Sequence, residues 1–370
     1  MAIDSVNPAL VPGARGEVEI AEYCAGWLAA HGFAVHRLAD DASRPSIVGL
    51  AAGNGGGPSL MFNGHIDTVT TAGYAGDPFA ALRREGRLYG RGAYDMKGGV
   101  AAMMVAAARA RELGLTGDVL VACVADEEHA SLGTAEVLRH FHADAAIVTE
   151  PTHLEPCIAH KGFAWFDILI HGRAAHGSMP EQGIDAITRA GHFLVALEQL
   201  DQRLRASPSH GSLGTGSIHA SLIRGGEEMS SYPAACRISI ERRTVPGETA
   251  QSVAAEIAAI LGRIRAEQPD FRADLEPGLV RAPFAVGEDE VIVDAVQRAA
   301  AGRLGVSPAL GSRPFWTDCA LFQEAGIPAV LFGASGGGAH TVEEWADEAS
   351  VLALCDILLE TARSFCTNRQ

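Results

Sequence analysis

The sequence predicts an α/β fold in which helices cover both faces of a sheet and a second, smaller unit is inserted into the first. Strand-like and helix-like hydrophobic patterns alternate over residues 16–150 and again after Pro277, which is typical of a helix-covered sheet. From about Gly162 the order changes to strand, helix, strand, strand, helix, strand, which describes a self-contained split unit. We therefore predict one domain from residues 1–162 and 278–370, and an inserted domain from residues 163–277.

The first domain begins with apolar residues at helical spacing that stop at Gly32, and buried strands then follow as short apolar runs. The expected elements are a helix over 16–32, strands over 46–50 and 59–65, an alanine-rich helix over 96–114, a strand over 118–125, a helix over 131–142 and a strand over 144–150. Ligand sites in such folds lie at the carboxyl ends of the strands.

The inserted domain opens with residues 163–172, which alternate apolar and polar side chains as a half-buried strand does. Its other expected elements are a helix over 183–204, strands over 216–223 and 234–243, a helix over 250–268 and a strand over 271–277. The first domain then resumes with a helix over 291–305, a strand over 328–333 and a closing helix over 351–365.

Composition excludes several classes of protein. The formal charge is −16, from 45 acidic and 29 basic residues without a Lys/Arg-rich run, so neither nucleic acid nor an anionic membrane is an expected partner. No apolar stretch has the length of a membrane span, and the N-terminus lacks a basic segment followed by an apolar core. The seven scattered cysteines include no C-x-x-C pair, which favours a reduced, cytoplasmic compartment with each thiol a small buried apolar group.

Polar residues that can bind a metal gather where predicted strands and turns end. They are His65 with Asp67, Asp95, the run Asp126, Glu127 and Glu128, Glu150, and His340 after a glycine-rich loop. In an extended chain His65 and Asp67 point to the same side, so one could bind a metal while the other holds the imidazole. Each group alone has an ordinary explanation, such as a helix cap for Asp95. Together, two histidines and at least three carboxylates on converging strand ends favour a metal site.

This set of nitrogen and oxygen ligands suits two divalent ions bridged by a carboxylate, with zinc the first choice and cobalt or manganese as alternatives. Cations would also explain why a buried strand ends on three consecutive carboxylates. One of them could bind metal while its neighbour serves as general base. Asp126 is expected to be the spare member, in a turn or facing solvent.

A family resemblance rests on several motifs in order. They are SVNP, GHIDTV, GRGAYDMKGG, DEEHASLG, TEPT, GRAAHGSMPEQGIDAI, ERRTVPGET, AGIPAVLFG and AHTVEEW. With these motifs the chain resembles the di-zinc metallopeptidase and amidohydrolase family that includes acetylornithine deacetylase, succinyl-diaminopimelate desuccinylase, aminoacylase and carboxypeptidase G. The resemblance implies a zinc-exopeptidase-like catalytic domain, an inserted ferredoxin-like βαββαβ dimerisation (lid) domain and a homodimer.

The resemblance also implies roles for the metal-site residues. By it, one metal is bound by His65 and Glu150, the other by Glu128 and His340, and Asp95 bridges them. Asp67 would orient His65, and Glu127 would take a proton from the attacking water and pass it to the leaving amine.

Four further residues are candidates for substrate recognition. His176 matches a histidine that reaches across the dimer to donate to the oxyanion, and Arg243 matches an arginine that grips the substrate carboxylate, with Arg242 as the alternative. Gly337 lies in the loop before His340, where glycines permit close approach of a ligand or form a flexible loop. Ser230 stands where many relatives carry Asn, a residue of the substrate and inter-subunit site.

The sequence thus predicts a homodimeric two-metal hydrolase that cleaves the amide of N-acyl amino acids. A metallo-dipeptidase or carboxypeptidase of the same fold is a close alternative, since it needs the same metals and base. A carbamoyl or ureido amidohydrolase is disfavoured, because such relatives tend to carry His at the position of Glu150. A non-catalytic binding relative is disfavoured by Glu127 and the complete ligand set.

Overall fold

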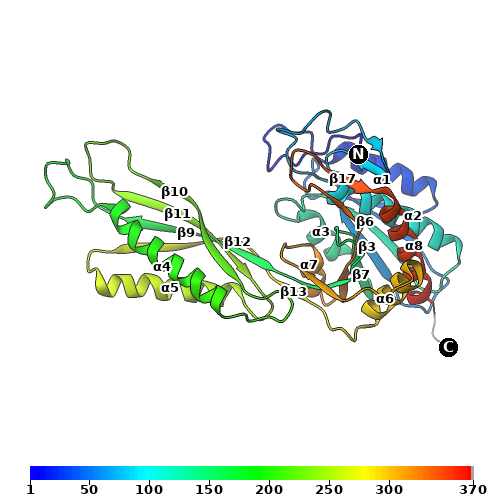
Figure 1. Ribbon diagram of the computed structural model, residues 1–370. Coiled ribbons are helices and arrows are strands. Elements are labelled where there is room, and N and C mark those ends of the chain that lie inside the picture. The colour runs from blue at the N-terminus through cyan, green and yellow to red at the C-terminus, as the bar shows by residue number, and fades with distance from the viewer. Residues whose placement is uncertain (368–370) are drawn as a thin grey trace. The chain divides into compact units, whose positions relative to one another are not determined.

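The computed structural model describes residues 1–367, which form two compact units (Figure 1). Unit 1 comprises Met1–Ile158, Ala285–Gly311 and the chain from Thr317 on. Unit 2 comprises Ala159–Phe284 and the short segment Ser312–Trp316. Each unit has a hydrophobic core of its own.

The main sheet has the strand order β1-β2-β6-β3-β7-β15-β8-β13, with β14 paired to β8. Its strands are β1 (Ala34–Leu38), β2 (Ser46–Ala51), β3 (Leu60–His65), β6 (Val119–Val124), β7 (Ala145–Val148), β8 (Cys157–His160), β13 (Phe284–Ala285), β14 (Gly311–Arg313) and β15 (Ala329–Leu331). Strand β3 runs parallel to β6 and β7, and all six residues of both β3 and β6 are buried. The apolar runs predicted as buried strands therefore form the centre of the sheet.

Helices cover both faces of this sheet, which confirms the predicted α/β fold. They are α1 (Val18–Ala30), α2 (Gly98–Glu112), α3 (Leu132–His140), α6 (Val291–Leu304), α7 (Cys319–Glu324) and α8 (Glu348–Phe365), and a π-helical turn η1 (Ala93–Lys97) leads into α2. Figure 1 shows α2 and α8 on one face and α3 and α7 on the other. The alanine-rich sequence of α2 buries small side chains such as Ala106, Ala107 and Ala110, which lets the helix pack closely on its neighbours.

A second, small sheet in unit 1 was not predicted. Its order is β16-β17-β5-β4, from β4 (Leu82–Arg84), β5 (Arg87–Tyr89), β16 (Gly336–Gly337) and β17 (Trp345–Asp347). Strands of two or three residues are too short to show a period of two, so the sequence gives no signal for them. The loop that carries His340 connects β16 and β17.

Unit 2 has a four-stranded antiparallel sheet of order β10-β11-β9-β12 with two helices. Its elements in chain order are β9 (Gly162–His171), α4 (Ala186–Ala206), β10 (Ser217–Gly225), β11 (Ala235–Thr244), α5 (Ala250–Glu267) and β12 (Arg272–Arg281). This is the β-α-β-β-α-β order expected from the sequence. Burial alternates along β9, where Phe166, Ile168 and Ile170 enter the core, so the prediction of a half-buried strand is confirmed.

All seven cysteines are free and buried, which confirms that they act as small apolar side chains. Within residues 1–367, none of the helices combines the length and the apolar character needed to cross a bilayer.

Candidate metal centre

Three neighbouring parallel strands bring the predicted metal-site residues to one edge of the main sheet. His65 is the last residue of β3, Glu127 and Glu128 follow β6, and Glu150 follows β7. Because β6, β3 and β7 are adjacent and parallel, their carboxyl ends meet at the same edge. Asp95 lies in η1 and caps no helix, since the N-cap position of α2 is Lys97.

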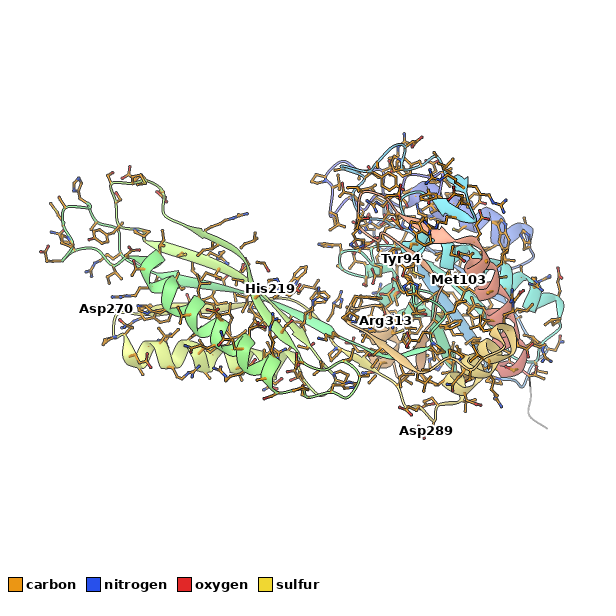
Figure 2. The ribbon with its side chains drawn as sticks, in the orientation of Figure 1. Tyr94, Met103, His219, Asp270, Asp289 and Arg313 are labelled. Carbon is orange, nitrogen blue, oxygen red and sulfur yellow. The ribbon has the colours of Figure 1, made fainter. Side chains whose placement is uncertain are left out.

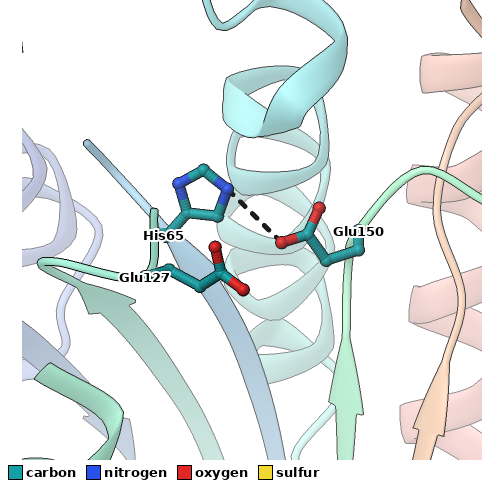
Figure 3. Close-up of side chains that lie close together, drawn as sticks. All are labelled: His65, Glu127 and Glu150. Carbon is teal, nitrogen blue, oxygen red and sulfur yellow. Dashed lines mark ion pairs between the residues drawn. The ribbon is translucent and has the colours of Figure 1, made fainter. Parts of the chain in front are cut away.

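His65 is buried at the centre of the cluster. Its Nε2 lies 3.1 Å from Asp95 Oδ1 and 3.3 Å from Glu150 Oε1. Its Nδ1 lies 3.0 Å from the carbonyl oxygen of Asp67 and 3.5 Å from Asp67 Oδ1. Figure 3 shows the His65 ring and the carboxyl groups of Glu127 and Glu150 turned toward one another. One ring nitrogen of His65 thus faces the carboxylate cluster while Asp67 holds the other.

His340 approaches the same cluster from the loop between β16 and β17. Its Nε2 lies 3.2 Å from Asp95 Oδ2 and 3.1 Å from Glu128 Oε2. The two oxygens of Asp95 therefore face different histidines, as a bridging carboxylate requires.

Two groups of side chains could each hold a metal ion. One is His65, Glu127 and Glu150, and the other is His65, Asp95 and Glu128, with ligand atoms within 4.8 Å of one another in each group. Among residues 1–367, Glu128 Oε1 is buried without a hydrogen-bond partner, which leaves a lone pair directed at no donor of the chain. Imidazole nitrogen and carboxylate oxygen are ligands that zinc, cobalt and manganese accept. The residues present therefore fit divalent cations.

The carboxyl groups in the cluster resist ionisation. Removal from water, together with the charge of Glu150, raises the pKa of Glu127 well above its ordinary value. Burial and the charge of Asp95 raise the pKa of Glu150 to about 7 and also raise the pKa of Glu128. Like charges this close are unfavourable without a counterion, and divalent cations would supply one.

Asp95 differs from the other carboxyl groups. Burial alone would raise its pKa, but hydrogen bonds to His340 and His65 outweigh burial and keep the pKa of Asp95 low. The same contacts with Asp95 and Glu128 raise the pKa of His340 to about 10. Asp95 is thus the carboxylate that stays ionised between two histidines.

Asp126 lies in a turn, one of its two expected places, where its carbonyl oxygen accepts from the N–H of Ala130 at 3.1 Å, but it does not face solvent. Its side chain is 0% exposed, and it pairs with Arg44 Nη2 at 2.7 Å. Arg44 also donates to both oxygens of Glu17, at 2.7 and 2.6 Å, and both Glu17 and Arg44 are buried. The solvent-facing alternative was wrong because a single buried guanidinium supplies the counterion, and Arg44 lies in a stretch with the sequence pattern of an ordinary loop.

Asn7 joins Asp126 to the metal-site residues. Its side-chain amide donates to Asp67 Oδ2 at 2.8 Å and to Asp126 Oδ1 at 3.1 Å. Asp67 also accepts hydrogen bonds from the backbone N–H groups of Glu127 and Glu128, at 3.2 and 3.3 Å. Asn7 belongs to the SVNP motif, but sequence reasoning gave it no role. Asp67 therefore fixes both the His65 ring and the start of the loop that carries Glu127 and Glu128.

Two of the remaining predicted residues lie near each other in unit 2. His176 is exposed, with its Nδ1 2.8 Å from Ser178 Oγ. The backbone N–H of the next residue, Gly177, donates to the carbonyl oxygen of Ser230 at 2.7 Å. The segments that carry His176 and Ser230 are therefore neighbours.

The two adjacent arginines of β11 face opposite sides of the sheet. Arg242 is 1% exposed and forms ion pairs with Glu248 and Glu256, so its guanidinium is not available to a ligand. Arg243 is half-buried, lies 5.5 Å from the ring centre of Phe163 and pairs with Glu241 at 2.7 Å. Arg243 is thus the more accessible of the two.

The glycines before His340 are approached by protein side chains. A Cβ on Gly336 would lie 2.5 Å from Cδ2 of Tyr94, whose place is marked in Figure 2, and one on Gly337 would lie 3.3 Å from the ring of Trp345. These glycines form strand β16, so close packing on aromatic rings accounts for them without a flexible loop.

Comparison with known proteins places this geometry in a family. The model of the peptidase family M20/M25/M40 matches residues 61–364. The chain is 31% identical to acetylornithine deacetylase from Myxococcus xanthus over 368 residues, which covers 96% of this chain and 94% of that protein. It is 28% identical to N-formyl-4-amino-5-aminomethyl-2-methylpyrimidine deformylase from Bacillus subtilis, covering 97% of this chain and 92% of that protein.

The fold is shared with a solved Bacillus subtilis structure described as a dinuclear metal binding peptidase from the M20 family. The TM-score is 0.73 at 20% sequence identity, and the match covers 95% of this chain and 93% of that one. The resemblance expected from the motifs is confirmed. The chain therefore belongs to the peptidase family M20/M25/M40, and it is a metal-dependent hydrolase of amide bonds.

Proposed function

We propose that this protein removes the acyl group from N-acyl amino acids at a site that holds two divalent metal ions, with zinc the first choice. The proposal rests chiefly on the position of Asp95. One of its carboxylate oxygens lies 3.1 Å from His65 Nε2, and the other lies 3.2 Å from His340 Nε2. The two curated relatives support the reaction class, since their names describe removal of an acetyl or a formyl group from nitrogen.

In this proposal His65 and Glu150 hold one ion, Glu128 and His340 hold the other, and Asp95 contacts both. The unpartnered Oε1 of Glu128 supports its assignment as a ligand. When bound, the ions would polarise the scissile carbonyl and make water a better nucleophile at neutral pH. Asp67 would keep the His65 ring in place through its contacts with Nδ1.

Glu127 is the proposed general base. It would take a proton from the attacking water and deliver that proton to the nitrogen of the leaving amine. Its position suits this task, because its carboxyl group is turned toward His65 and Glu150 (Figure 3), where an ion would hold the attacking water. Arg243 would bind the substrate carboxylate with its planar guanidinium, and Ser230 and Gly337 would line the substrate site.

The first test is release of free amine by the zinc- or cobalt-loaded protein from substrates that share one amino acid. The panel contains its N-formyl, N-acetyl and N-succinyl derivatives, a dipeptide, an N-carbamoyl derivative, and an N-formyl amine that lacks a carboxylate. We expect turnover of one acyl class and little turnover of the amine without a carboxylate. Preference for the dipeptide would place the protein among peptidases instead, and preference for the amine without a carboxylate would remove the role of Arg243. No turnover with both metals bound would favour a binding function.

We further propose that the protein is a homodimer in which His176 donates to the oxyanion in the partner's site. Strand β10 supports the dimer, because it is an edge of the unit 2 sheet and exposes Leu222 and Ile223 by 55% and 53%. His176 is exposed and thus available to a second molecule.

Mixing two inactive variants tests this arrangement. His176→Ala and Glu127→Gln homodimers should both be inactive, whereas mixed dimers should regain part of the activity because one site then has both residues intact. Activity is measured after mixing under conditions that exchange subunits, with each variant alone as the control. Absence of rescue in dimers shown to be mixed, or a monomer at assay concentration, would rule out action across the dimer.

A further inference from the structure

Glu344 is a buried carboxylate that the proposed mechanism does not use. Its side chain is 1% exposed and accepts four hydrogen bonds. Oε1 accepts from the backbone N–H groups of Tyr94 and Asp95, at 2.9 and 3.0 Å. Oε2 accepts from the backbone N–H of Gly92 at 2.9 Å and from Arg91 Nη1 at 2.8 Å. A carboxylate offers about four acceptor positions, so Glu344 has its capacity filled by the segment that carries Asp95.

Arg91, the charged partner of Glu344, joins three segments. Besides its ion pair with Glu344, its Nη2 donates to the carbonyl oxygen of Thr341 at 2.8 Å. Its Nε donates to the carbonyl oxygen of Thr70, shortly after Asp67 in the chain, at 3.1 Å. Arg91 is 2% exposed, so these bonds are protected from competing water.

The loop around His340 is also held by backbone bonds, in which the N–H of Ala75 donates to the carbonyl oxygen of Val342 at 2.6 Å and that of Gly90 to the carbonyl oxygen of Glu344 at 3.1 Å, but neither bond reaches Asp95. The His340 side chain is 53% exposed, and residues Thr341, Val342 and Glu343 are exposed. By contrast, His65 ends a fully buried central strand and Glu150 lies just beyond another. The bonds of Glu344 and Arg91 therefore help to fix the position of His340 relative to Asp95. The position of His65 relative to Glu150 is fixed mainly by the buried strands β3 and β7.

We propose that Glu344 and Arg91 are positioning residues that hold Asp95 and His340 at the separation needed by the metal ion between Glu128 and His340. This inference rests on the proposed two-metal site. It predicts an asymmetry, in which loss of the Glu344 carboxylate weakens the ion at Glu128 and His340, whose site depends on both Asp95 and His340, more than the ion at His65 and Glu150, whose site shares only Asp95. A buried ion pair that served only the stability of the fold would not distinguish the two ions.

The test compares Glu344→Gln with Glu343→Gln, a matched control in the adjacent, exposed residue. Gln has the size of Glu, but its amide nitrogen cannot accept the hydrogen bonds that the lost oxygen accepted. Stepwise binding of Zn²⁺ and Co²⁺ to the metal-free full-length protein is measured by competition with a chelator. In Glu344→Gln we expect one binding step to lose about 10–100-fold in affinity and the other step to lose clearly less. Glu343→Gln should match the unaltered protein at both steps.

Arg91→Lys is the second variant, and it tests the same inference if Glu344→Gln does not fold. Lysine keeps the charge but cannot make the three directed bonds of the guanidinium, so the same selective loss is expected. Equal loss at both steps, or no loss in a folded variant, would overturn the inference. So would an unaltered protein that binds a single ion. Because metal binding is measured without substrate, a protein with two ions but no amidohydrolase activity would refute the proposed function and leave this inference standing.

Discussion

Replacing Glu127 with Gln should lower kcat by about 10²–10⁴-fold while both metal ions stay bound. The amide keeps the size of the side chain but cannot take a proton from water. Glu127 lies beside Glu150 and His65, and its pKa is raised by removal from water and by the charge of Glu150. In the proposed assignment Glu150 and Glu128 bind the ions, which leaves Glu127 as the neighbouring carboxyl group that can move a proton.

The measurement combines steady-state kinetics with metal content determined by mass spectrometry, and Glu343→Gln, at an exposed acidic residue, is the control. Two results would contradict the assignment. Retention of turnover within about tenfold would show that another group is the base. Loss of one metal ion would show that Glu127 is a ligand, a role that its place in a group with His65 and Glu150 would also allow.

The parts of the site that follow from sheet geometry could be predicted from the sequence. His65 and Glu150 belong to apolar runs that end in polar residues, and neighbouring parallel strands bring such ends together. Glu344 could not be predicted in its role. The strands next to the loop that carries Glu344 have only two or three residues, so they show no sequence pattern. The four groups that donate hydrogen bonds to Glu344 lie about 250 residues earlier in the chain.

Arg242 and Arg243 show a second limit. Adjacent side chains of strand β11 face opposite sides of the sheet, and the alternation of apolar and polar residues in its sequence shows this period of two. Ile238 and Ile240 share this period with Arg242, so the pattern places Arg242 on the inward face of the sheet and Arg243 on the other face. The pattern does not reveal the counterions, Glu248 and Glu256, which are only partly buried and pair with the inward-facing Arg242.

Replacing Arg44 with Met should lower the free energy of unfolding by about 3–5 kcal/mol, because breaking a buried ion pair leaves uncompensated charge inside the protein. Arg44 is 8% exposed, and its partners Glu17 and Asp126 are both 0% exposed. Methionine replaces the apolar part of the side chain but supplies neither charge nor donors. Asn7 would still donate to Asp126, but a single amide hydrogen cannot replace the guanidinium. Urea unfolding of the metal-free protein measures the change.

Arg37→Met is the matched control, since the Arg37–Glu22 pair is 41% and 59% exposed and should contribute only about 0–1 kcal/mol. Adding Asp126→Asn to Arg44→Met should recover part of the loss, because the amide removes one buried charge and Asn tolerates the left-handed backbone of φ 67° at this position. Adding Glu17→Gln as well should recover more. If Arg44→Met costs no more than Arg37→Met, or if neutralising Asp126 makes the protein less stable still, then Arg44 is not the counterion that allows Asp126 to be buried after a strand.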